Sequence, residues 1–258
     1  MPASAVLPFQ RSPHDVSALL AEWEALAKET GMTCVELART EEWSVPAYLT
    51  RAASEGRSAV YLSTGVHGDE AGSAWGVLAW AKANARRLRE EAFVICPCLN
   101  PVGLALNTRA DHRGLDINRR FHLVDDPLIG AWQRWVRGFT LHLGLCLHED
   151  YDAPGCYVYE LSGARDGPLS ASALRRAGEV ILPDPRAEIE GSPARGGIIQ
   201  RREVPQHIEG PEAIVLYEMG CPVTLTFETP SEFGLDIRVR AQQTFIEAAI
   251  EHLSPHRA

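Results

Sequence analysis

Residues 58–89, SAVYLSTGVHGDEAGSAWGVLAWAKANARRLR, decide the fold class. The segment opens with a continuous apolar run over residues 58–63, which has the length and character of a buried strand. A polar segment over residues 65–70 follows, and an alanine-rich helical stretch then extends to about residue 89. Strand, loop and helix in this order form the repeating unit of parallel α/β sheets.

The rest of the chain repeats this alternation. Helical spacing of apolar residues covers residues 16–30 and 235–253. Strand patterns occupy six further segments, the last of them inside a loop rich in Pro and Gly: residues 33–37, 45–50, 93–99, 141–147, 223–227 and 197–201. We therefore expect a single α/β domain over residues 1–258, with a mainly parallel sheet covered by helices on both faces and ligand sites beyond the carboxyl ends of its strands.

Composition argues against several classes of partner. The 258 residues include 34 acidic and 25 basic residues, so the net charge is −9, and no Lys/Arg cluster offers a surface for nucleic acid. The N-terminal segment lacks a basic stretch followed by an apolar run, and no stretch approaches the roughly 18 apolar residues of a membrane span. We expect a cytoplasmic protein with no nucleic-acid or membrane partner, while its oligomeric state stays open.

The segment His67-Gly-Asp-Glu70 places an imidazole and a carboxylate three positions apart. A loop that enters a helix can turn both toward one cation, and both groups suit zinc. A surface histidine near an acid is the alternative interpretation, because such pairs are common. The position after a buried-strand pattern favours the metal site, and Gly65 and Gly68 leave room for the backbone to bend close to a metal.

A catalytic zinc normally has three protein ligands and one open position. The third ligand is expected from His148, which directly follows the apolar run of residues 141–147. At the end of a strand this imidazole can face the same crevice as His67 and Glu70. The alternative is a solvent-facing histidine at a strand terminus.

Two further segments carry groups suited to hydrolysis. Asn118-Arg119 can form a carboxylate clamp, since a guanidinium binds a carboxylate through two parallel hydrogen bonds, and a second arginine near the metal could stabilise an oxyanion. Glu228 ends the run of residues 223–227, where it could act as a general base. A solvated charged loop and a glutamate that caps a turn are the alternatives.

These segments occur in the order seen in zinc metallocarboxypeptidases, and the chain resembles that family from about residue 58 to residue 230. The resemblance implies a central mixed sheet of about eight strands and one zinc per chain, with Glu228 as the general base and Asn118 and Arg119 as the clamp for the substrate carboxylate. The zinc ligands that it implies are His67, Glu70 and His148. The matching motifs are His67-Gly-Asp-Glu70, Asn100-Pro-Val-Gly103, Gly114-Leu-Asp-Ile-Asn-Arg119, Leu147-His148 and Thr226-Phe-Glu228.

Three assignments depend on details of the resemblance. Arg109 lies where compact bacterial relatives, such as the murein tripeptide amidases, have the oxyanion arginine, and Arg113 is the competing assignment. Tyr217 is the nearest candidate for the mobile tyrosine that covers the substrate. The third ligand is followed by Glu149-Asp150, where a small hydroxyl residue is more usual in the family.

The resemblance implies a metallocarboxypeptidase or related amidohydrolase that acts on a short peptide or modified amino acid with a free carboxylate. The alternative is an N-acyl amino acid deacylase similar to aspartoacylases and succinylglutamate desuccinylases. Those enzymes tend to carry a β-rich domain beyond the catalytic glutamate, whereas the 30 residues after Glu228 have the pattern of one helix, which favours the peptidase. A non-catalytic binding protein is disfavoured, since neither a ligand nor the base is missing.

Overall fold

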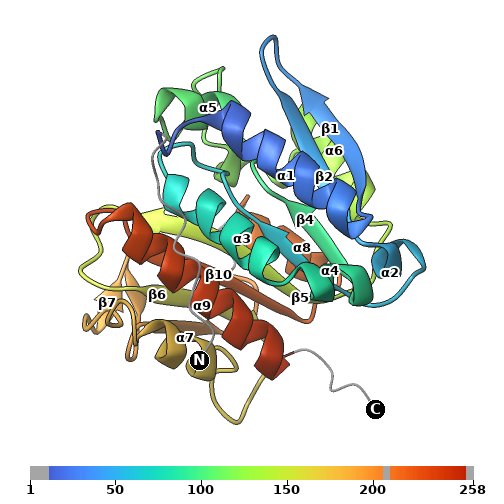
Figure 1. Cartoon of the computed structure of the whole chain (residues 1–258). Helices are drawn as coiled ribbons and strands as arrows, with labels where there is room; N and C mark the ends of the chain where they lie inside the picture. Colours follow the sequence, from blue (N-terminus) through green and yellow to red (C-terminus); the bar gives the residue numbers. More distant parts are fainter. Residues whose placement is uncertain (1–11, 206–209, 254–258) are drawn as a thin grey trace.

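An eight-stranded mixed sheet forms the centre of the computed structural model, which describes residues 12–205 and 210–253 (Figure 1). The strands lie in the order β1-β2-β4-β3-β5-β10-β6-β9. Strands β4, β3, β5 and β10 run parallel to their neighbours in this central part, and antiparallel pairs flank it. The prediction of a single α/β domain with about eight mainly parallel strands is confirmed. The strands are β1 (Thr33–Arg39), β2 (Ser44–Leu49), β3 (Ala59–Ser63), β4 (Phe93–Cys96), β5 (Leu141–Asp150), β6 (Tyr157–Ser162), β9 (Ile198–Arg201) and β10 (Val223–Pro230), with a separate pair β7 (Glu188–Ile189) and β8 (Ser192–Pro193).

Helices cover both faces of the sheet, as expected. The first buried cluster joins the sheet to α1, α3, α7 and α9, which lie in front of the strands in Figure 1. The second cluster joins the opposite face to α6 and α8. The helices are α1 (Val16–Thr30), α2 (Arg51–Ser54), α3 (Ala71–Ala83), α4 (Ala85–Glu90), α5 (Pro101–Leu106), α6 (Pro127–Val136), α7 (Ala171–Ala177), α8 (Glu212–Glu218) and α9 (Leu235–Leu253), with a 3₁₀ turn η1 (Ile117–Arg119).

Local chemistry explains where the best-predicted helices begin and end. Helix α1 has its predicted bounds, because the Asp15 carboxylate accepts a hydrogen bond from the N–H of Ala18 and Gly31 adopts the left-handed conformation that ends a helix. Helix α9 also has its predicted bounds. The expected single helix to residue 89 is wrong in one respect: it divides into α3 and α4 at Asn84.

Two strands extend further than predicted, and this matters for the site. Strand β5 continues to Asp150 and β10 to Pro230, so that His148 and Glu228 lie inside the paired ladder and not beyond it. The apolar sequence patterns of β5 and β10 stop before the strands end. The last side chains of both strands face polar neighbours, while their backbones remain paired. Strand β6 has no counterpart in the sequence prediction and adds two tyrosines, Tyr157 and Tyr159, to the same end of the molecule.

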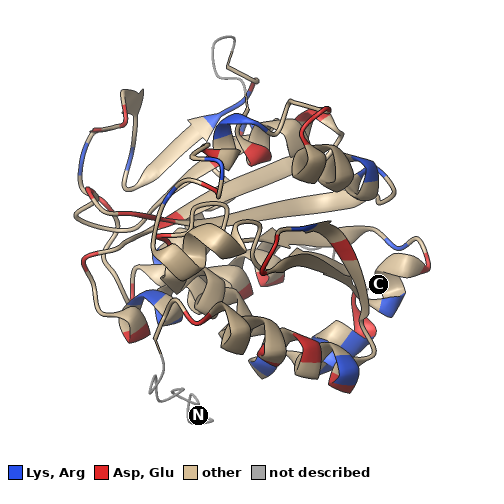
Figure 2. Cartoon of the chain, turned by 90° about the horizontal axis from the view of Figure 1, so that it is seen from above, with Lys and Arg blue, Asp and Glu red and all other residues tan. Residues whose placement is uncertain are grey.

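Charge is distributed without one dominant sign in the view of Figure 2, where basic and acidic segments are interspersed along the described elements. That view shows no continuous basic stripe of the kind that follows a nucleic-acid backbone. Among the described residues, no helix is both long enough and apolar enough to cross a membrane. All six cysteines are free thiols, and all but Cys34 are buried.

Candidate metal centre and active site

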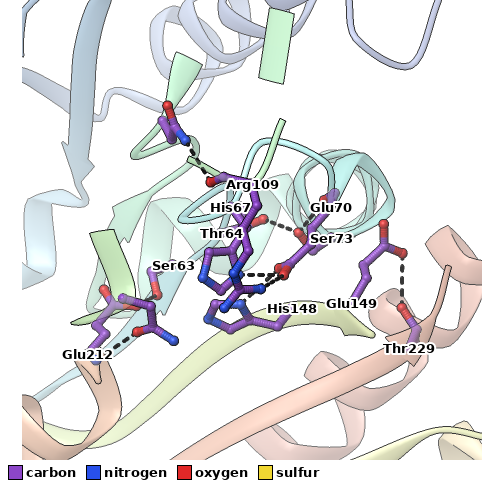
Figure 3. A network of polar contacts seen from close by, with 12 residues as sticks. Ser63, Thr64, His67, Glu70, Ser73, Arg109, His148, Glu149, Glu212 and Thr229 are labelled. Carbon is purple, nitrogen blue, oxygen red and sulfur yellow. Dashed lines mark hydrogen bonds and ion pairs between the residues drawn. The ribbon is translucent and has the colours of Figure 1, made fainter. Parts of the chain in front are cut away.

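Three buried side chains meet at the carboxyl ends of the central strands (Figure 3). His67 and Glu70 come from the loop between β3 and α3, and His148 comes from β5. Their exposed fractions are 3%, 4% and 2%, and one ligand atom from each lies within 4.8 Å of the others. The structure therefore brings together the three residues that the sequence predicts as metal ligands.

The Glu70 carboxylate lies between the two imidazoles. Its Oε1 is 2.5 Å from Nδ1 of His67, and its Oε2 is 2.8 Å from Nδ1 of His148. Burial lowers the pKa of His67, but the Glu70 and Asp116 carboxylates outweigh burial and raise this pKa to about 9. The negative charge that favours a proton here also favours a divalent cation, which competes with protons for the same nitrogens. Two imidazoles and one carboxylate, buried together, fit the ligand set of a catalytic zinc.

The loop that carries His67 and Glu70 needs glycine at a point of close backbone contact. A Cβ atom on Gly68 would lie 1.9 Å from the carbonyl carbon of Gly103 in α5. Gly65 has φ +61°, a left-handed conformation that glycine adopts without strain. Gly65 and Gly68 were expected to let the backbone bend close to a metal. In the structure, Gly68 lets the loop pack against α5.

Asn100 fixes the next part of the site. Its side chain caps α5 by accepting a hydrogen bond from the N–H of Gly103, and its amide nitrogen donates to the carbonyl oxygens of Arg109 and Ala110. This side chain therefore holds the loop that carries Arg109 close to Glu70. Asn100 belongs to a motif that the sequence analysis identified. The spacing of that motif gave no indication that the Asn100 side chain contacts residues 109 and 110.

Asp116 contacts the candidate ligand His67 and was not assigned in the sequence analysis. Its Oδ1 lies 3.2 Å from Nε2 of His67, on the side of the ring opposite Glu70, and its Oδ2 accepts hydrogen bonds from Arg109. Burial raises the pKa of Asp116, but His67 and Arg109 outweigh this and hold it well below the usual range. A carboxylate on the outer nitrogen of a metal-binding histidine orients the ring and increases its basicity. The sequence feature that could have identified Asp116 is its position two residues before the Asn118-Arg119 pair.

We expect Asp116→Asn to lower metal affinity by about 10- to 100-fold, the usual effect of removing such an outer carboxylate. Competition between the protein and a chromogenic chelator for zinc measures the change. Asp125→Asn is the matched control, since Asp125 is exposed and does not line the cavity that His67 and Glu70 border. Equal zinc affinity in the Asp116 variant and the wild type would contradict this role.

The two competing arginines are placed differently. The Arg109 guanidinium lines the main cavity and approaches Glu70 at 3.8 Å and Asp116 at 3.0 Å. The Arg113 guanidinium is paired with Asp111 and Asp126, away from the metal ligands. The location thus favours Arg109 for contact with a substrate at the metal centre.

The predicted clamp residues lie on one side of the cavity. Asn118 accepts a hydrogen bond from the backbone N–H of Glu212 at 3.1 Å, which leaves its amide N–H groups available to a ligand. The Glu212 carboxylate accepts hydrogen bonds from the hydroxyls of Tyr61 and Ser63, each at 2.6 Å. Figure 3 shows the contact with Ser63. The Arg119 guanidinium also lines the cavity and has no hydrogen-bond or ion-pair partner within residues 12–205 and 210–253.

Glu228 lies directly opposite His148 in the parallel ladder between β10 and β5, and it lines the same cavity. Burial raises the pKa of Glu228, His148 opposes the shift, and nearby carboxylates including Glu70 and Asp150 add to it, giving a value of about 8. A nearby cation would act in the opposite direction. A carboxylate that titrates near neutrality can both accept and return a proton.

One cavity of about 690 Å³ is lined by His67, Glu70, Arg109, Asn118, Arg119 and Glu228. Tyr217 lies on α8 and is not among the described residues that line it, so the structure shows no contact between this side chain and the site. Tyr157 and Tyr159 of β6 line the cavity instead. A role for Tyr217 stays a prediction without a contact to support it.

Glu149, which follows His148 in place of the small hydroxyl residue that is more usual in the family, has a structural explanation. Its carboxylate accepts hydrogen bonds from the N–H of Gly72 in α3, from Thr229 in β10 and from Arg238 in α9, the last at 2.6 Å. A Cβ atom on Gly72 would lie 2.3 Å from Glu149 Oε1, so the glycine allows this close approach. Glu149 therefore ties the strand that bears His148 to two helices.

Known proteins resemble the chain in part of its sequence and in nearly all of its fold. The model of the succinylglutamate desuccinylase/aspartoacylase catalytic domain matches residues 57–127. None of the curated protein sequences matches the chain significantly. Among solved structures, a candidate metallopeptidase from Shewanella amazonensis SB2B has a TM-score of 0.85 at 19% identity, covering 96% of this chain and 97% of that one.

Two more distant structures share the arrangement of sheet and helices. A metallo-carboxypeptidase from Burkholderia cenocepacia has a TM-score of 0.65 at 17% identity, covering 90% of this chain and 68% of its own. Carboxypeptidase A from Helicoverpa armigera has a TM-score of 0.68 at 13% identity, covering 94% and 74%. At these identities the comparison concerns the fold.

Proposed function

Because the chain has the zinc carboxypeptidase-like fold, we propose that it is a zinc-dependent hydrolase that cleaves an amide bond next to a free carboxylate. The observation that carries the proposal is the convergence of His67, Glu70 and His148 within 4.8 Å, beside a cavity lined by Glu228 and by the Arg119 guanidinium, which has no partner among the described residues. The substrate would be a short peptide or a modified amino acid.

Each residue at the site has a separate role in the proposed hydrolysis. Zinc held by His67, Glu70 and His148 would supply a Lewis acid that polarises the scissile carbonyl and acidifies a water molecule. Glu228 accepts a proton from the attacking water and returns it to the leaving amine. Arg109 donates hydrogen bonds to the oxyanion as it develops, which favours the transition state over the bound substrate.

The clamp selects the substrate. Arg119 pairs with the terminal carboxylate, and Asn118 donates a further hydrogen bond to the same group. Contacts that are equal in the ground state and the transition state set substrate affinity more than the rate of the chemical step.

We expect amidation of the terminal carboxylate to lower kcat/KM. The corresponding loss of transition-state stabilisation is about 2–4 kcal/mol, because Arg119 is then desolvated without its partner. Arg119→Ala should lose most activity on the free acid and discriminate little between acid and amide. Kinetics on a matched acid and amide pair measure both effects. Arg137→Ala removes an exposed charge at the end of α6 and is the control. Equal cleavage of the two substrates by the wild type would favour an endopeptidase or an unrelated amidase.

A second function, N-acyl amino acid deacylation, is favoured by one observation. The family model that matches residues 57–127 describes succinylglutamate desuccinylases and aspartoacylases. Both reactions break an amide next to a carboxylate, so the same metal site and clamp would serve either. Release of amine from short peptides and from N-acyl amino acids, compared on one zinc-loaded preparation, separates the two.

A further inference from the structure

Glu212 is a buried carboxylate that the proposed mechanism does not use. It lies in the first turn of α8 and is 1% exposed. Within residues 12–205 and 210–253 it forms no ion pair, and its oxygens are bound instead by the hydroxyls of Tyr61 and Ser63. Burial raises the pKa of Glu212, and these two hydrogen bonds oppose the rise. Burying a carboxylate without a cation is unfavourable, so its contacts indicate a specific role.

The side chain of Glu212 is anchored to the strand that leads to the metal ligands. Tyr61 and Ser63 lie two positions apart on β3, so both hydroxyls face the same side of the sheet. The Tyr61 hydroxyl accepts a hydrogen bond from Trp132 of α6 at 2.7 Å, which leaves its own proton for Glu212. His67 follows Ser63 by four residues. The carboxylate is therefore fixed relative to the strand end that carries His67.

The backbone of the same residue contacts the clamp. The N–H of Glu212 donates to the side-chain oxygen of Asn118 at 3.1 Å, so the amide nitrogen of Asn118 is directed to the substrate. Asn118 and Arg119 line the cavity, as do Pro211 and Ala213 on either side of Glu212. Glu212 is not among the lining residues, because its side chain turns toward β3. Any effect of Glu212 on a substrate therefore passes through its neighbours.

Two further contacts join the start of α8 to the clamp. The N–H of Phe121 donates to the carbonyl oxygen of Gly210 at 3.0 Å. Gly210 has φ +104°, and a Cβ atom there would lie 2.5 Å from the carbonyl carbon of Arg119. The clamp itself belongs to a 3₁₀ turn of three residues, whose own hydrogen bonds have poor geometry. Its position thus depends on the packing of residues 210–212 against residues 118–121.

We propose that Glu212 is a positioning residue that fixes the carboxylate clamp relative to the metal ligands. Its carboxylate is bonded to β3 and its N–H is bonded to Asn118, so one residue sets the separation between the two sites. This inference rests on the proposed function, because the clamp binds the carboxylate of the substrate. A fixed separation favours cleavage of the one bond whose carbonyl reaches the metal when the carboxylate lies in the clamp.

The test uses zinc-loaded variants and a matched pair of substrates, a free acid and its amide. Glu212→Ala is expected to raise KM for the acid by about 10- to 100-fold, the range for one hydrogen bond to a charged group, while kcat stays within about threefold. KM for the amide should change little, because the amide does not use the clamp. Zinc content should remain at one ion per chain, since no metal ligand is altered.

The conservative variant Glu212→Gln should keep nearly normal kinetics. Its amide oxygen can accept the Tyr61 proton, and its amide nitrogen can donate to Ser63, so both anchors remain. Ser63→Ala and Tyr61→Phe each remove one anchor and should raise KM for the acid by less than Glu212→Ala does. These single-anchor variants carry the test if Glu212→Ala does not fold.

Two controls separate positioning from a general loss of stability. Thr50→Val removes a buried hydroxyl that is bonded to the backbone of Glu91 and Phe93, at the amino-terminal end of β4 and opposite the site. It should lower the unfolding temperature without changing KM. Glu212→Ala combined with Asn118→Ala should be no worse on the acid than Asn118→Ala alone, since Glu212 acts through Asn118.

Calorimetric titration with free alanine and alanine amide gives a result that does not depend on turnover. The wild type should bind alanine more tightly than its amide, Glu212→Ala should reduce this difference, and Glu212→Gln should keep it. If Glu212→Ala matches the wild type while Arg119→Ala does not, or if Thr50→Val raises KM equally, the positioning role is wrong and the proposed function stands. If the wild type cleaves nothing and binds the two ligands equally, the proposed function fails, and the role of Glu212 fails with it.

Discussion

Glu228→Gln is expected to bind zinc normally and to lose about two to four orders of magnitude in kcat, the range for removal of a general base. The amide has nearly the shape of the carboxylate, so the ladder between β10 and β5 should be unchanged. It cannot accept the proton of the attacking water. The loss should therefore appear in kcat while KM changes little, because Glu228 is not part of the clamp.

The control for this variant is Glu232→Gln, four residues later on the exposed segment before α9. It removes the same charge without touching the cavity and should retain full activity. Metal content and the unfolding temperature confirm that both variants are folded and loaded. Activity within threefold of the wild type in Glu228→Gln would remove this residue from the mechanism.

His148→Ala is expected to lose the stoichiometric metal and, with it, all measurable hydrolysis. Two ligands remain, which is too few for the three-residue site of a catalytic zinc. The change also leaves one oxygen of the buried Glu70 carboxylate without its hydrogen bond, so the free energy of unfolding should fall by about 1–3 kcal/mol. Metal analysis after gel filtration measures the first effect, and denaturant unfolding measures the second.

His142→Ala is the matched control on the same strand. His142 lies at the start of β5, where its Nδ1 is 3.1 Å from Ser58 Oγ, away from the cavity. We expect that variant to keep one metal ion per chain. Full zinc stoichiometry and affinity in His148→Ala would show that the metal site is wrongly assigned.

The sequence predicted the architecture well where its signal was local. The apolar run before His67 and the helical spacing of residues 16–30 and 235–253 correspond to elements with nearly the same bounds. Strand β6 was missed, although Tyr157 and Tyr159 alternate with other residues in the manner of a strand. Its assignment depends on pairing with β10 and β9, which are distant in sequence.

The convergence of His67, Glu70 and His148 could be predicted because each follows a strand pattern and parallel strands deliver their ends to one edge. The surrounding contacts could not. The pairing of Asp116 with His67, the contact of Asn100 with the Arg109 loop and the contact of Glu212 with Asn118 depend on how distant segments meet. Spacing along the chain does not determine such contacts.

The central claim is that one metal ion at His67, Glu70 and His148 is required for hydrolysis. The most direct test is a zinc titration of the chelator-treated protein, with release of amine from a free-acid substrate measured at each step. We predict that activity rises linearly and reaches its plateau at one equivalent of zinc per chain. Undiminished activity in the metal-free protein, or activity that does not respond to zinc although the metal binds, would contradict the account.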